Sequence, residues 1–138
     1  MANSYTSSAT LIITKDDLCP DALSELLGIA PSRSWKRGDR KLFKGEGEFL
    51  YKWGGWKLFQ PTEMDEKGID EQLNFWASFI SQRSNAMRGL AEDSFDIVLD
   101  CYISTQEQLT LSVGCQRMVC FGCAGVRIDI NVFFNQTV

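Results

Sequence analysis

Residues 27–39 read LGIAPSRSWKRGD, and this stretch separates a helical opening of the chain from a basic and aromatic middle. Gly28 follows an apolar stripe of helical spacing, and a glycine just past such a stripe commonly ends a helix in the left-handed conformation. Pro31 cannot continue the helix and redirects the backbone. Trp35 follows among basic residues, before a turn at Gly38-Asp39. The stretch therefore predicts the end of a first helix and the rigid base of the loop that follows.

The residues before this stretch predict one strand and one helix. Residues 10–14 read TLIIT, and their β-branched apolar side chains favour a strand that begins near Ser7. Asp16 and Asp17 follow as turn or cap residues. Pro20 suits the first position of a helix, where its missing N–H costs nothing.

Downstream, the basic and glycine-rich residues 37–47 predict a long exposed loop or a loose hairpin. Apolar residues of helical spacing predict a long helix at residues 69–90 and a short helix that Ser112 caps. A tight hairpin turn at Gly54-Gly55 joins the first two of five further expected strands, at residues 49–53, 56–59, 95–103, 109–111 and 126–134.

The resulting element order is β-α-β-β-α-β-β-α-β, within one domain that spans residues 1–138. The segregated helices and short strand connections predict an α+β fold. We expect a two-layer sandwich, with a mostly antiparallel or mixed sheet and helices packed on one face.

The composition is that of an average globular domain, with 138 residues, 44% hydrophobic and 23% charged. A formal net charge of −4 and a pI of about 4.8 argue against nucleic acid and anionic membranes as partners, because both bind basic surfaces. The first residues show no signal peptide, and no apolar run approaches the ~20 residues that cross a bilayer. We therefore expect a cytoplasmic protein.

The chain contains no histidine. Histidine is the most frequent general base and the most frequent metal ligand in proteins. The sequence also has no phosphate-binding loop, dinucleotide motif or G-x-S-x-G elbow. These absences predict a non-enzymatic protein with no cofactor and no catalytic residues.

The aromatic and basic middle of the chain holds the best candidates for binding. One interpretation is a ligand pocket or a partner surface; the other buries Trp35 and Trp56 at the sheet edge, with the lysines only solvating a loop. The candidate binding residues are Trp35, Arg37, Asp39, Tyr51, Trp53 and Trp56.

Three cysteines give a weaker signal for a metal. Cys115, Cys120 and Cys123 have the spacing C-x4-C-x2-C, which matches part of an iron–sulfur loop. A cluster needs a fourth thiolate, and no cysteine follows Cys123, so Cys101 or Cys19 would have to supply it. We favour the alternative, in which the three are small apolar residues that close a helix onto the sheet.

Three aspartates are expected on strands, on the side opposite the apolar residues. Asp96, Asp100 and Asp129 either face solvent or approach one another across neighbouring strands as an acid/base or metal pair. We favour the first, because alternation alone does not bring two carboxylates together.

Four pieces of the sequence together resemble a widespread bacterial family, Domain of Unknown Function 4279. They are the first strand running into DDLCP, the LGIAPS block with Trp35 and Gly38-Asp39, the Gly55-Trp56 strand start, and the closing alternation around Asp129. The resemblance implies a small single-domain protein with no established activity, and some relatives look like immunity proteins encoded beside bacterial toxins. The CFGC segment at residues 120–123 and the aromatic residues 49–53 depart from the family pattern.

From these observations we expect a non-enzymatic binding domain. Its most concrete form, which the resemblance implies, is an immunity-like protein that neutralises a toxin, with the acidic pI steering a basic toxin toward it. The alternative is a small-molecule sensor that uses the aromatic middle third.

Overall fold

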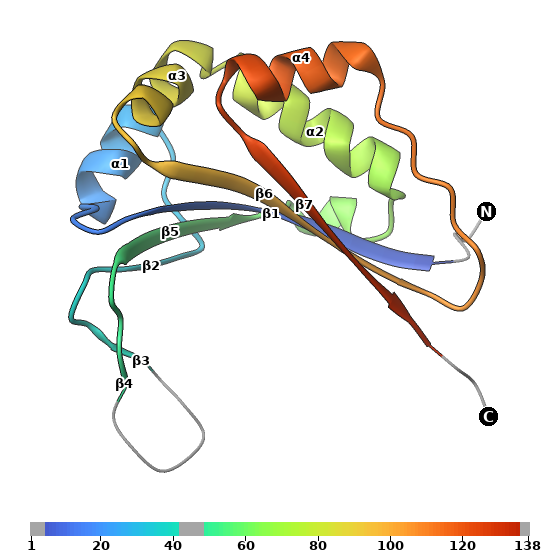
Figure 1. The fold of residues 1–138 in the computed structure, drawn as a ribbon, viewed down its shortest axis with the longest axis horizontal. Coiled ribbons are helices and arrows are strands. Elements are labelled where there is room, and N and C mark those ends of the chain that lie inside the picture. Colours follow the sequence, from blue (N-terminus) through green and yellow to red (C-terminus); the bar gives the residue numbers. More distant parts are fainter. Residues whose placement is uncertain (1–4, 42–48, 136–138) are drawn as a thin grey trace.

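The computed structural model describes residues 5–41 and 49–135, and within them four helices lie on one face of a five-stranded sheet (Figure 1). The elements are β1 (Tyr5–Lys15), α1 (Pro20–Leu27), β2 (Arg33–Trp35), β3 (Arg40–Lys41), β4 (Phe49–Leu50), β5 (Gly54–Phe59), the 3₁₀ turn η1 (Thr62–Met64), α2 (Ile69–Ser81), α3 (Ser84–Glu92), β6 (Asp96–Thr105), α4 (Cys115–Cys123) and β7 (Arg127–Phe134).

The sheet is mixed, with β1 at its centre and the strand order β2-β5-β1-β6-β7. Strand β1 runs antiparallel to both β5 and β6, and β2 runs antiparallel to β5. Helix α4 carries the chain from β6 to β7, which lies parallel to β6. Strands β3 and β4 form a separate hairpin that extends away from the sheet on the side opposite the helices (Figure 1). A mixed sheet with helices on one face confirms the predicted α+β fold class.

The core lies between the sheet and the helices. Ala9, Leu11 and Ile13 alternate along β1 and are fully buried, as the period of two requires. Trp76 of α2 is also fully buried, and its Nε1 donates a hydrogen bond to the Ala9 carbonyl at 3.0 Å. Each buried side chain of this size contributes roughly 1.5–3 kcal/mol. The core therefore holds the helical layer firmly to one side of the sheet.

Helix α1 ends where the sequence predicts. Gly28 adopts the left-handed conformation, with φ 73°, and its N–H donates to the Ser24 carbonyl at 2.8 Å. Pro20 is the first helical residue. The left-handed glycine and the following proline therefore release the chain toward β2, at the edge of the sheet.

The predicted single helix at residues 69–90 is two helices, which break at Arg83. Arg83 has φ −124° and ψ 24°, outside the helical region. Its Nε donates to the Leu27 carbonyl at 2.9 Å, and its guanidinium lies 3.8 Å from the centroid of the Phe79 ring. The side chain thus bonds one carbonyl at the end of α1 and one in α2, and the change of direction lets Met87 and Leu90 reach the core.

The predicted turn at Gly54-Gly55 is wrong, because both glycines are paired residues of β5. A Cβ on Gly54 would lie 2.8 Å from the Leu18 carbonyl oxygen, and a Cβ on Gly55 would collide with the Trp35 ring. Close packing therefore requires these glycines. The hairpin of this region is formed by β3 and β4, and of the expected strand at residues 49–53 only Phe49–Leu50 pairs. Residues 42–47 of the predicted loop lie outside the described residues.

Two further predictions near the C-terminal half are wrong. Residues 109–111 form no strand; Leu109 and Leu111 instead pack against the core from an irregular segment. Ser112 does not cap α4, since the N-cap is Gly114 and the helix begins at Cys115. The apolar side chains of this segment are partly buried without strand pairing, so their alternation alone wrongly predicted a strand.

Candidate functional site

The face of the sheet opposite the helices is the first distinctive feature of the surface. In Figure 1 all helices of the described residues lie on the other side, so no helix among them covers this face. We call it the open face, and its residues alternate with the buried ones along each strand. They include Arg33, Trp35, Lys57, Phe59, Thr10, Ile12, Thr14, Asp96, Asp100, Tyr102, Arg127, Asp129, Asn131 and Phe133, and Val98 lies among them although it is buried.

An aromatic pair lies at the β2 end of the open face. Trp35 lies over Gly55, its partner in the β2–β5 pairing, and stacks on Tyr51 with ring centroids 4.7 Å apart and an interplanar angle of 20°. Lys57 Nζ lies 5.9 Å from the Trp35 ring centroid, and Lys41 Nζ lies 5.0 Å from that of Tyr51. The pair is therefore an aromatic platform flanked by two cations.

The turn at residues 36–39 holds this platform in place. The Asp39 carboxylate accepts a hydrogen bond from the Lys36 N–H at 2.8 Å. The Gly38 N–H donates to the Tyr51 carbonyl at 2.8 Å, and the Tyr51 N–H donates to the Asp39 carbonyl at 2.9 Å. Gly38 has φ 91°, a conformation that glycine adopts without strain. Asp39 is thus a positioning residue, since its side chain closes the turn that carries Tyr51.

The Trp35 indole N–H is buried without a hydrogen-bond partner among the described residues. Buried indole N–H groups usually find an acceptor, because leaving one unpaired costs about 1–3 kcal/mol. The packing of the ring over Gly55 and against Tyr51 must therefore outweigh that cost. This unpaired N–H group lies within the platform.

A cleft of about 640 Å³ adjoins the platform, where the end of β1 meets the start of β6. Arg37 and Trp53 line one side, and Trp53 is 48% exposed. Ser94 lies at the other side with φ 66°, a positive value that is uncommon for a serine. The remaining lining residues are Thr14, Lys15, Asp16, Asp17 and Asp96.

The structure separates the six candidate binding residues into four groups. Trp35 and Tyr51 form the platform, Arg37 and Trp53 line the cleft, and Asp39 positions the turn between them. Trp56 is fully buried on the helical side, where its Nε1 donates to Ser24 Oγ at 3.0 Å. Trp56 is therefore a core residue, as in the second interpretation of the sequence.

Sequence reasoning missed five residues of the cleft: Thr14, Lys15, Asp16, Asp17 and Ser94. They lie at the ends of strands far apart in the sequence, and only the β1–β6 pairing brings these ends together. The turn residues after β1 were a signal for one wall of the cleft, but nothing local indicated the other.

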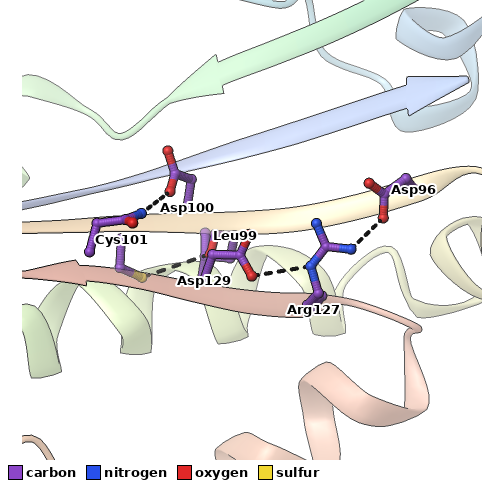
Figure 2. Close-up of polar contacts among 7 residues, drawn as sticks. Asp96, Leu99, Asp100, Cys101, Arg127 and Asp129 are labelled. Atoms are coloured by element: carbon purple, nitrogen blue, oxygen red, sulfur yellow. Dashed lines mark hydrogen bonds and ion pairs between the residues drawn. The ribbon is translucent and has the colours of Figure 1, made fainter.

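The three strand aspartates lie on the open face, and each accepts a hydrogen bond from a neighbouring side chain (Figure 2). Arg127 donates from Nε to Asp129 and from a terminal nitrogen to Asp96, each at 3.1 Å. Asn131 donates to Asp100 at 3.0 Å. The hydrogen bond to Asp129, followed by the charge of Asp96, raises the pKa of Arg127. The arrangement is a ladder of paired side chains across β6 and β7.

The cysteines do not gather in one place. Cys120 is half-buried and contacts the Ala77 carbonyl at 3.5 Å, while Cys115 and Cys123 are exposed on α4. Burial, followed by the charges of Asp100 and Asp129, raises the pKa of the Cys101 thiol to about 12. Within residues 5–41 and 49–135, no group of three or more Cys, Asp or Glu side chains is placed to hold a metal ion. Among the same residues, no helix has the length and apolar character to cross a membrane.

The fold and this surface define a small α+β domain with a one-sided helical layer and an open sheet face that carries an aromatic platform. The chain belongs to the family described as domain of unknown function DUF4279, whose family model matches residues 3–134. Comparisons with curated proteins and with solved structures gave no match. The match confirms the family resemblance seen in the sequence.

Proposed function

We propose that this protein is a non-enzymatic binding domain that captures a protein partner on the platform end of its open face. The observation on which the proposal rests is the Trp35–Tyr51 stack between the ammonium groups of Lys41 and Lys57. Tryptophan and tyrosine dominate binding energies at protein interfaces, because they bring large rigid area at a low cost in side-chain entropy. The Trp35 ring is already held over Gly55 and against Tyr51, so the platform needs little rearrangement when a partner binds.

The charge of this region suggests the kind of partner. Residues 33–57 contain eight of the fourteen lysines and arginines but only three of the eighteen acidic residues. The remainder of the chain is strongly acidic, so the platform end is a basic region on an acidic protein. A partner with an acidic patch is complementary to it. Local charge decides docking at short range, so this proposal replaces the basic partner that net charge alone suggested.

A bacterial toxin is the partner that we propose, with the protein acting in the cytoplasm to neutralise it. The likeness of some family relatives to immunity proteins supports this choice. The carboxylates on the open face are engaged in hydrogen bonds, and the Cys101 thiol is protonated rather than a thiolate, and both facts support binding over catalysis.

The test is to titrate the purified product of the adjacent gene with the protein by calorimetry and to assay its toxicity. Lys41→Glu combined with Lys57→Glu should weaken the complex at least tenfold, about 1.4 kcal/mol, and abolish protection. The matched control is Lys67→Glu, an exposed lysine outside the basic region. Equal affinity of both variants, or a neighbour that neither binds nor kills, would overturn the proposal.

A second candidate function, small-molecule binding, is favoured by the cleft beside the platform. Among the described residues, neither the Arg37 guanidinium nor the Asp16 carboxylate has an ion-pair partner, and the exposed Trp53 lines the same cleft. A free cation, a free anion and an aromatic ring suit a small zwitterion with a flat apolar group.

Three related probes test this second function. L-phenylalanine carries both charges, whereas phenethylamine and 3-phenylpropionate each carry one. Titration followed by tryptophan fluorescence should show binding of L-phenylalanine, weaker binding of the other two, and loss of the signal in Trp53→Leu. Absence of any change with all three probes would contradict a zwitterion site.

A further inference from the structure

Strand β7 leaves an unusual amount of apolar surface exposed at the edge of the sheet. Among the described residues it pairs with β6 alone. On its helical side Ile130, Val132 and Phe134 are 40%, 44% and 67% exposed, and on the open face Phe133 is 51% exposed. A long apolar edge strand is a template for pairing with another strand.

The neighbouring strand shows that this exposure is not general. The residues of β6 that pair with Ile130 and Val132 are Cys101 and Ile103, and both are almost fully buried. The helical layer therefore covers β6 and the start of β7, where Ile128 packs against the core, and the rest of β7 projects beyond it (Figure 1). β7 contains no proline and no lysine, and its two charged residues, Arg127 and Asp129, lie in its first half and on the open face, so its second half lacks these devices that protect an edge.

The backbone N–H and C=O groups on the free edge of β7 are regularly spaced. The Asn135 N–H donates to the Thr105 carbonyl at 2.9 Å, so the odd-numbered residues direct their backbone groups toward β6. Because these groups alternate along a strand, residues 128, 130, 132 and 134 direct theirs outward. An arriving strand would find regularly spaced donors and acceptors.

We propose that the occupant of this edge is β7 of a second copy of the chain, paired antiparallel about a twofold axis at Ile130. On the helical side this register places Ile130 opposite Ile130 of the second copy, and Ile128 opposite Val132 of the second copy. These rungs are apolar throughout, and each copy covers side chains that are exposed in the single chain. A twofold interface requires such self-complementarity.

The open face is complementary in the same register. Asp129 lies opposite Asn131 of the second copy, which pairs a carboxylate with an amide donor. Arg127 lies opposite Phe133 of the second copy, which sets a guanidinium against an aromatic ring. No like charges face each other. A twofold at Asn131 would instead place the Asp129 carboxylate opposite Phe133 of the second copy, so the axis at Ile130 fits the charges better.

The first test is the mass of the full chain in solution, measured by light scattering on a sizing column. The expected mass is twice the 15.6 kDa of the chain. Ile130→Lys places two ammonium groups face to face across the axis and should give a monomer with an unchanged circular dichroism spectrum. The matched control is Val119→Lys, an exposed apolar residue that belongs to α4 and not to the paired strand, which should leave the dimer intact.

Two results would overturn the dimer. One is a wild-type protein that stays monomeric across the accessible concentrations. If such a monomer captures a different protein and Ile130→Lys abolishes that capture, the edge binds that partner and not a second copy. The other is a dimer that Ile130→Lys leaves unchanged.

The register has its own test, in a variant whose exposed Cys19, Cys115 and Cys123 are replaced by serine. A short thiol-to-thiol reagent should link two copies of Ile130→Cys but not two copies of Phe134→Cys, since residues 134 lie far from the axis. The reverse pattern would refute the proposed pairing.

Discussion

Gly55→Ala tests directly how Trp35 is held on the open face. The backbone of Gly55 is ordinary strand, so alanine meets no conformational penalty there. Its added Cβ, however, would occupy space that the Trp35 ring already fills. The ring must move, and its stack with Tyr51 is lost or weakened. We expect a folded protein with a damaged platform.

The size of the effect follows from three contributions. Overpacking of this kind costs about 1–3 kcal/mol, and loss of an aromatic pair costs about 0.5–1.5 kcal/mol. Replacing glycine by alanine returns about 0.4–1 kcal/mol, because it restricts the unfolded chain. The net loss in the free energy of unfolding should be roughly 2 kcal/mol, a large part of the 5–15 kcal/mol of a typical domain.

Urea unfolding followed by far-ultraviolet circular dichroism measures this loss, and near-ultraviolet dichroism reports the tryptophan environment. Gly114→Ala is the matched control, because a Cβ there meets nothing within 4 Å. A double-mutant cycle with Trp35→Ala isolates the contact. If Gly55→Ala costs as much in the Trp35→Ala background as in the wild type, the clash with the ring is not the cause and the reasoning fails.

Three further predictions concern stability. Gly28→Ala should lower the free energy of unfolding by about 1 kcal/mol, because its φ of 73° strains any side chain although the space is open; an unchanged urea midpoint would contradict this. Gln72→Leu should lower the free energy of unfolding by about 2–4 kcal/mol, because this fully buried amide donates to the Ser7 carbonyl at 2.9 Å and accepts from Ser7 Oγ at 2.9 Å. The control is the exposed Gln82→Leu, which should change the free energy of unfolding little. The pKa of Cys101 rises from 9.0 to about 12 on folding, so folding favours the neutral thiol, and its contribution is complete below pH 9 and lost as the pH rises toward 12. Urea midpoints in that window should fall more for the wild type than for Cys101→Val, and parallel curves would refute the assignment.

The sequence correctly predicted the elements that depend only on residues close to one another in the chain. The end of α1 needs only a left-handed glycine and a nearby proline, and both are visible in the sequence. The alternation of β6 and β7 likewise reports which residues share a face. The break at Arg83 escaped prediction because the groups that it serves include the Leu27 carbonyl, 56 positions away. The turn predicted at Gly54-Gly55 was wrong for the same reason. Glycine is required there because Leu18 and Trp35, which are distant in sequence, pack too closely to leave room for a Cβ.

By itself, the sequence determined the fold class, the family and the residue types from which a binding surface could be made. It could not decide that Trp35 lies on the open face while Trp56 lies in the core, although both belong to the same aromatic region. That distinction depends on the pairing of β2 and β5 with their neighbours, because a shift of one residue exchanges the two faces of a strand. Which face stays open, and how far the helices reach over β7, is decided by the packing of helices that are distant in sequence. Only the tertiary structure therefore shows which aromatic and basic residues form the platform and the cleft, and that one edge of β7 is free.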